Sequence, residues 1–87
     1  MAHLNYVSQN KTSISVDYAD MPANAEAVFV NTETGAQAVS QSTALGEGGT
    51  GSADIPIVPD LSPGQYHLLA QDRSTRQRIA QTVSFYL

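Results

Sequence analysis

Cysteine is absent from this 87-residue chain, so neither a disulfide, a thiolate metal site nor a thiol nucleophile is available to it. Tryptophan is absent too, and positive charge is scarce: four Lys and Arg stand against eight Asp and Glu, a net charge of −4. This sign disfavours a broad nucleic-acid-binding face, which needs clustered cations. Long apolar runs are also lacking, so the sequence predicts neither a membrane-spanning helix nor a signal peptide.

The chain has the length of one compact domain, and we place that single domain at residues 3–87. A domain of this size buries only about two-thirds of its unfolded surface, so one core must supply nearly all of its stability. Charged residues make up 14% of the chain, which is too few for an intrinsically disordered protein. We therefore expect an ordered, folded unit.

Hydrophobic residues recur with the two-residue period of a strand rather than the period of a helix. In the segment 13–18, Ile14, Val16 and Tyr18 share one face and polar residues share the other. One-sided strands of this kind are typical of antiparallel sheets. Turn signals separate seven such segments, and we expect strands at residues 3–8, 13–18, 25–30, 36–41, 53–58, 65–72 and 77–86.

This pattern predicts an all-β fold, a seven-stranded antiparallel β-sandwich. Pro56 has no backbone N–H to donate, so we expect the strand at 53–58 to lie at a sheet edge. Residues 46–51 contain four glycines, and we expect them to form a mobile loop. Their Gly-x-Gly-x-x-Gly spacing matches a dinucleotide-binding motif, but that motif opens a helix, and Ile55-Pro56-Ile57 is not a helix start.

The segment Leu61-Ser62-Pro63-Gly64-Gln65-Tyr66 resembles the tyrosine corner of fibronectin type III and related immunoglobulin-like domains. The resemblance implies that the Tyr66 ring packs in the core above Leu61, while its hydroxyl bonds to the backbone a few residues upstream. It also implies that the second to seventh expected strands correspond to strands B, C, C′, E, F and G of that family. The family usually carries a tryptophan on strand B; this chain has none, and Tyr18 is expected at a comparable position.

Candidate catalytic and metal-binding residues are few. His3 and His67 have no cysteine partner and no His-x-x-x-His spacing, and the alternation points His67 out of the core. No Gly-x-Ser-x-Gly motif frames a serine nucleophile. A calcium site built from Asp17, Asp20 and Asp60 is a weaker alternative, because such sites usually need clustered carboxylates. We therefore expect no enzymatic activity, no catalytic residue, no cofactor and no metal.

The charge is unevenly distributed along the chain. Residues 1–71 carry one lysine against seven acids, a balance of −6, whereas residues 72–87 carry three arginines against one acid, a balance of +2. Arg73, Arg76 and Arg78 thus lie together on the last expected hairpin, and guanidinium groups pair bidentately with carboxylate or phosphate. Two interpretations remain open: these arginines contact a partner, or they keep an exposed hairpin soluble.

The last strands also predict a contact surface on one sheet. If Tyr66 and Leu68 face the core, then Leu69 faces outward, and Tyr86 lies out of phase with Phe85. Apolar side chains gathered on the solvent face of a sheet indicate a patch for another protein or another copy. The alternative is a β-bulge that shifts the phase and buries them.

The sequence therefore predicts a non-enzymatic structural or protein-interaction module that acts in assembly or adhesion. We expect its partner to be another protein or a second copy, with no nucleic acid and no membrane insertion. Domains of the resembled kind occur as extracellular repeats and as appendages of phage virions, so an extracellular or virion-surface setting is expected. The alternative is a small carbohydrate-binding module with Tyr6 and Tyr86 as stacking platforms. The predicted protein-binding residues are Arg73, Arg76, Arg78, Leu69 and Tyr86, and the predicted structural residues are Tyr66 and Leu61.

Overall fold

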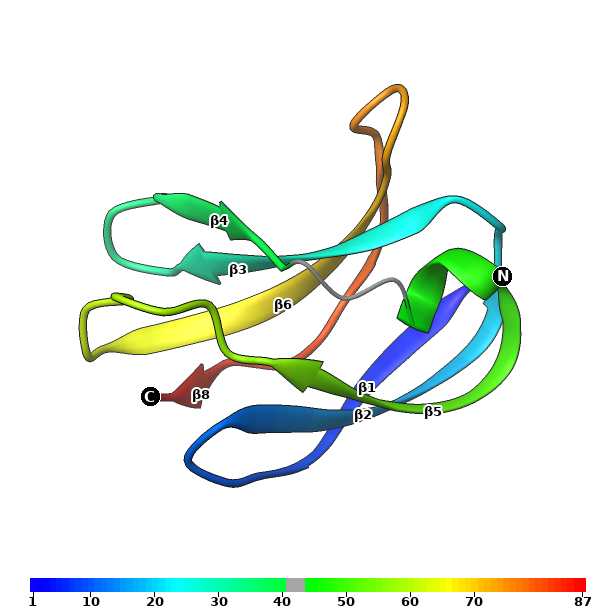
Figure 1. The fold of residues 1–87 in the computed structure, drawn as a ribbon. Coiled ribbons are helices and arrows are strands. Elements are labelled where there is room, and N and C mark those ends of the chain that lie inside the picture. The colour runs from blue at the N-terminus through cyan, green and yellow to red at the C-terminus, as the bar shows by residue number, and fades with distance from the viewer. Residues whose placement is uncertain (41–43) are drawn as a thin grey trace.

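Two antiparallel sheets pack together in the computed structural model, which describes residues 1–40 and 44–87 (Figure 1). Sheet A has three strands in the order β1-β2-β5; sheet B has five, in the order β4-β3-β6-β7, with β8 also paired to β6. A short 3₁₀ turn, η1, precedes β5. The elements are β1 (His3–Gln9), β2 (Ser13–Met21), β3 (Ala25–Asn31), β4 (Gln37–Val39), η1 (Ala44–Glu47), β5 (Gly49–Pro56), β6 (Gln65–Asp72), β7 (Arg78–Gln81) and β8 (Phe85–Tyr86).

The hydrophobic core lies between the two sheets and follows from the alternation in each strand. Ile14 and Val16 of β2 and Ile55 of β5 point inward from sheet A, while Phe29 of β3 and Leu68 of β6 point inward from sheet B. All five side chains are fully buried. Burial of each such side chain contributes about 1.5–3 kcal/mol, so this interlayer contact is the main source of stability. The predicted two-layer antiparallel β architecture is confirmed.

A tyrosine braces the segment that connects the two sheets before β6. The Tyr66 ring is buried in the core, and its hydroxyl donates a hydrogen bond to the backbone carbonyl of Ser62 at 2.7 Å. Leu61 is half-buried and packs against the same core. The hydrogen bond predicted for Tyr66 is therefore present, and its acceptor lies four residues upstream.

Pro56 lies at the end of β5, which is an edge strand because it pairs only with β2 among the described strands. The backbone N–H of Ile57 donates to the Thr12 carbonyl at 2.8 Å, so Ile57 faces β2. Backbone groups alternate in direction along a strand, and the Pro56 nitrogen therefore faces away from the sheet. The predicted edge position of Pro56 is confirmed, and its missing donor costs no ladder bond.

The last predicted strand is broken into β7 and β8 by Thr82. The Thr82 hydroxyl accepts the Leu68 N–H at 3.0 Å, and the Thr82 N–H donates to the Leu68 carbonyl at 2.9 Å. One side chain thus replaces a backbone acceptor, and the described residues form eight strands rather than the predicted seven. Val83, which a regular strand would place on the same face as Phe85, is 72% exposed.

The glycine-rich segment also differs from its prediction. Gly46 belongs to η1 and β5 begins at Gly49, so residues 46–51 form a turn and a strand rather than a loop. Gly51 pairs with Tyr18, and a Cβ at Gly51 would lie 3.2 Å from the Tyr18 hydroxyl. Glycine here permits a close approach of a ring, which composition alone does not distinguish from flexibility. The strand predicted at 36–41 is observed as β4, at Gln37–Val39. Residue 41, the last residue of the predicted strand, lies outside the described residues.

Candidate functional site

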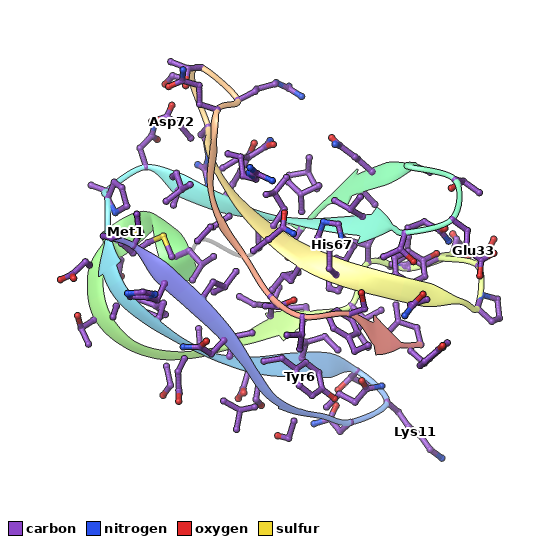
Figure 2. The ribbon with its side chains drawn as sticks, turned by 180° about the vertical axis from the view of Figure 1, so that it is seen from behind. Met1, Tyr6, Lys11, Glu33, His67 and Asp72 are labelled. Carbon is purple, nitrogen blue, oxygen red and sulfur yellow. The ribbon has the colours of Figure 1, made fainter. Side chains whose placement is uncertain are left out.

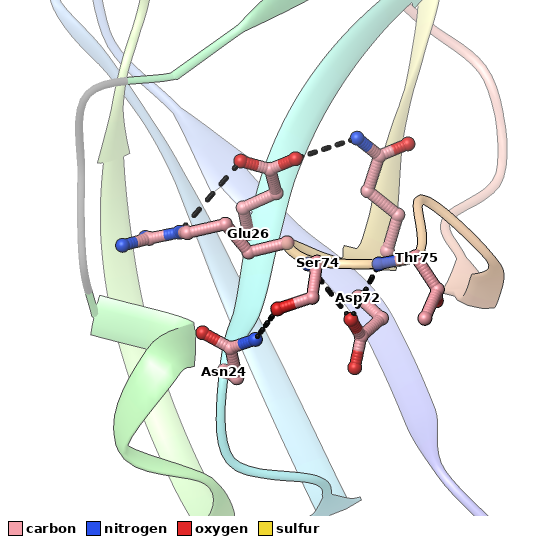
Figure 3. A network of polar contacts seen from close by, with 7 residues as sticks. Asn24, Glu26, Asp72, Ser74 and Thr75 are labelled. Atoms are coloured by element: carbon pink, nitrogen blue, oxygen red, sulfur yellow. Dashed lines mark hydrogen bonds and ion pairs between the residues drawn. The ribbon is translucent and has the colours of Figure 1, made fainter.

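The turn between β6 and β7 carries Arg73 and Arg76 and is fixed by the side chain of Asp72, the last residue of β6. The Asp72 Oδ1 atom accepts the backbone N–H groups of Ser74 at 2.8 Å and Thr75 at 2.9 Å (Figure 3). The Asp72 carbonyl accepts the N–H of Arg76 at 2.7 Å. The two side-chain bonds lower the pKa of the Asp72 carboxyl, because they favour its ionised form. The turn projects beyond the body of the two sheets (Figure 1).

The turn between β3 and β4 has the same arrangement with a different residue at the left-handed position. The Asn31 Oδ1 atom accepts the N–H groups of Glu33 and Thr34, and the Asn31 carbonyl accepts the N–H of Gly35. Gly35 has a φ of +76°, and Arg76, the matching residue in the β6–β7 turn, has a φ of +62°. Left-handed backbone costs an L-residue roughly 1–2 kcal/mol. Arg76 therefore occupies a position that favours glycine.

The three arginines do not act as one group. The Arg73 Nε atom lies 3.8 Å from Oε1 of Glu26, a buried carboxylate that also accepts a 2.6 Å hydrogen bond from Nε2 of Gln71 (Figure 3). Arg73 is thus held against sheet B. The structure gives Arg76, by contrast, no side-chain partner among the described residues, and its side chain is exposed at the turn.

Arg78 begins β7 and lies on the outer face of sheet B. Its Nη1 atom donates to Oε1 of Gln81 at 3.2 Å. His67 lies on the same face, opposite Val30, and is shown near the middle of β6 in Figure 2. Partial burial, and secondarily the Arg78 charge, lower the pKa of His67 from its ordinary value of 6.5.

The apolar residues predicted on the outer face of sheet B are present there but are mostly covered. Val28, Val30 and Leu69 form a small second cluster, separate from the interlayer core. Leu69 faces outward as predicted, yet it is only 8% exposed, because side chains of neighbouring strands cover it. Tyr86, at the end of the same face, is 71% exposed. Of the two apolar residues predicted to bind protein, Tyr86 therefore offers far more surface.

The end of the molecule opposite the β6–β7 turn is hollowed. Figure 2 shows Lys11 at this end and Asp72 at the other. An open groove of about 650 Å³ lies between the β1–β2 turn and the segment before β6. Lys11 and Asp60 contribute opposite charges to it, and none of its lining residues is aromatic. The lining residues are Gln9, Asn10, Lys11, Thr12, Ile57, Val58, Pro59, Asp60, Leu61, Pro63 and Leu87.

The aromatic residues predicted to stack on a sugar lie in different surroundings. The Tyr6 ring stacks on Phe85 with centroids 5.1 Å apart, and its hydroxyl donates to Gln9. Tyr6 is therefore half-buried in an intramolecular contact, and only Tyr86 presents a free ring face. A two-ring platform is not assembled.

Within residues 1–40 and 44–87, the structure brings together no group of three or more His, Asp or Glu side chains that could hold a metal. The same residues include no helix long and apolar enough to cross a membrane. Asp60 lies at the groove, whereas Asp17 lies in the middle of β2, so these two candidate calcium ligands belong to different regions.

Two features of the site were not predicted from the sequence. The contact of Glu26 with Gln71 and Arg73 joins residues distant in the chain and left no local signal. The two turns were expected between their strands, but their shared side-chain cap was not. Asn31-Thr32-Glu33-Thr34 and Asp72-Arg73-Ser74-Thr75 each begin with Asn or Asp, the residues whose side chains cap such turns. Comparisons with protein-family models, curated proteins and solved structures find no match for this chain.

Proposed function

We propose that this protein is a non-enzymatic, fibronectin type III-like module that binds another protein through the outer face of sheet B and the β6–β7 turn. The observation that carries the proposal is Arg76. Its backbone has the strained left-handed conformation on a projecting turn, whereas the matching turn has Gly35 at this position. Strained positions of this kind cluster at binding and catalytic sites.

The assignment to the fibronectin type III-like class rests on two observations. The strand order, β1-β2-β5 against β4-β3-β6-β7, is compatible with the A-B-E and C′-C-F-G sheets of that class. The bond from Tyr66 to the Ser62 carbonyl matches the tyrosine corner. Domains of this architecture commonly recognise partners through loops at the ends of the sandwich.

The composition of the outer face of sheet B supports a protein partner. Val28, Val30 and Leu69 are buried at its centre, whereas Arg78 and Tyr86, toward its two ends, are exposed. Tyr and Arg are enriched among the interface residues that dominate binding energy. We therefore place protein contact ahead of carbohydrate binding, for which a second exposed ring would be needed beside Tyr86.

The test is capture of a partner by immobilised protein from an extract of the source organism, with identification by mass spectrometry. Arg76→Gly removes the guanidinium and suits the left-handed backbone, whereas Arg76→Lys keeps a positive charge at the same place. We expect Arg76→Gly to reduce binding at least about tenfold and Arg76→Lys to reduce it less.

The matched control is Lys11→Ala, which removes a cation at the opposite end of the molecule and should leave binding unchanged. A captured protein that binds wild type and Arg76→Gly equally would contradict a role for the turn. Specific retention of a glycan, lost in Tyr86→Ala, would favour the carbohydrate alternative.

A further inference from the structure

The outer face of sheet A is acidic. Asp17 of β2 and Asp54 of β5 are both exposed on it, because their neighbours Val16 and Ile55 face the core. The residues opposite Asp17 in the ladders are Asn5 and Ser52, which are polar but uncharged. Among the described residues of these three strands, no lysine or arginine offsets the two carboxylates.

The outer face of sheet B has the opposite character. Its one carboxylate, Glu26, is buried and is already in contact with Gln71 and Arg73. Arg78 is exposed on β7, and Tyr86 is exposed on β8. This protein therefore presents two exposed carboxylates on the outer face of sheet A and one exposed arginine, Arg78, on the outer face of sheet B.

The sheet edges are poor sites for a partner, which leaves the faces. At the β5 edge, the backbone nitrogen of Pro56 faces outward and has no hydrogen to donate to a further strand. The β4 edge is only three residues long. A register shift places Val7 in a bulge of β1, and another register shift interrupts the pairing of β6 with β7. Short strands, proline and bulges at edges prevent addition of a further strand.

We infer that the partner of the sheet B face is the sheet A face of a second copy of this chain. The inference rests on the proposed function, because it names the partner of the same surface. Arg78 of one copy would meet the acidic patch around Asp17 of the next, so the charges are complementary. The molecule measures 31 × 25 × 20 Å, so one of its broad faces is of the order of the roughly 800 Å² per partner that a stable interface buries.

The two contacting faces differ, so the contact does not close on itself. After pairing, one copy keeps a free sheet A face and the other keeps a free sheet B face, and further copies add in the same orientation. Association should therefore proceed to chains whose length rises with protein concentration. It should weaken as salt rises, because the Debye length falls from about 30 Å at 0.01 M to about 10 Å at 0.1 M salt.

The experiment is sedimentation velocity on wild type, Asp17→Lys and Arg78→Glu, alone and mixed in equal amounts, at low and moderate salt. Each variant alone places like charges across the contact and should associate at least about tenfold more weakly than wild type. The equal mixture restores opposite charges at every contact, so its mean sedimentation coefficient should rise to that of wild type. Glu33→Lys and Lys11→Glu make the same charge changes away from both faces and should behave as wild type.

A wild type that remains monomeric at low salt over the whole concentration range would overturn the inference, as would a mixture no heavier than its components. Either result, combined with capture of a different protein in an Arg76-dependent manner, leaves the proposed function standing. Association that survives both charge reversals also contradicts the inference.

Discussion

At the scale of single residues, the Tyr66 hydroxyl makes one partly buried hydrogen bond, to the Ser62 carbonyl. Tyr66→Phe keeps the ring in the core and leaves that carbonyl without this donor. We expect it to lower the free energy of unfolding by about 1 kcal/mol, measured by urea denaturation. Tyr86→Phe is the control, because Tyr86 is exposed and should show no loss. Equal stability of Tyr66→Phe and wild type would remove this bond as a structural determinant.

Substitution of two glycines by alanine distinguishes the free-energy cost of left-handed backbone from the cost of a steric clash. Gly48 has a φ of +73°, and a Cβ there would lie 2.9 Å from the Met21 carbonyl oxygen. Gly35 has a φ of +76°, but a Cβ there would meet open space. We expect Gly35→Ala to cost about 1 kcal/mol and Gly48→Ala clearly more, since a backbone atom must also move. Thermal denaturation of both variants tests the order, and a smaller loss for Gly48→Ala would contradict it.

His67 should make stability depend on pH. Its folded-state pKa is lowered, chiefly by burial and secondarily by Arg78, so the unfolded chain binds a proton more readily. This contribution to stability is complete above the ordinary pKa of 6.5 and is lost as pH falls toward the lower folded-state pKa. We expect the urea midpoint to drop on acidification through this range, and the drop to become smaller in His67→Gln. His3→Gln, the control, should retain it.

At the scale of elements, the β6–β7 turn has an L-residue, Arg76, in the left-handed conformation, whereas the β3–β4 turn has Gly35 there. Arg76→Gly relieves the left-handed strain but adds freedom to the unfolded chain. We expect a net gain of about 0.5 kcal/mol in the free energy of unfolding. Arg76→Ala should give no gain, because alanine keeps the strain. Destabilisation by Arg76→Gly in urea would show that the guanidinium contributes to folding.

Strands with one buried face were predictable because their apolar residues alternate, whereas β3 is buried on both faces and its apolar residues follow one another. Ile14 and Val16 are the clearest example of alternation. The prediction failed between β7 and β8, where the Thr82 side chain replaces a backbone acceptor. It also failed in β5, where glycines predicted to form a loop are part of a strand. In both cases the deciding contact lies on another strand and leaves no trace in the local pattern.

At the scale of the whole molecule, both sheets share one core, so they should unfold together. Ile14→Ala removes a buried side chain from sheet A and should cost about 3 kcal/mol. We expect amide hydrogens of β3 and β6, in sheet B, to lose protection by the same amount of free energy. Hydrogen exchange measures this strand by strand. Loss confined to β1, β2 and β5 would mean that sheet B is stable without sheet A.

The order of residues by itself determined that the chain forms antiparallel strands and that Pro56 lies at an edge, because these depend on local periodicity and on the chemistry of one residue. The burial of Tyr66 and the bond of its hydroxyl were implied by the resemblance of residues 61–66 to a tyrosine corner. Tertiary structure alone decided that Leu69 is covered and that Arg73, unlike Arg76, has a side-chain partner among the described residues. It also decided that Asp17 and Asp54 share one outer face while Arg78 lies on the other. These features arise from residues on different strands, and their proximity is set by the packing and register of the sheets.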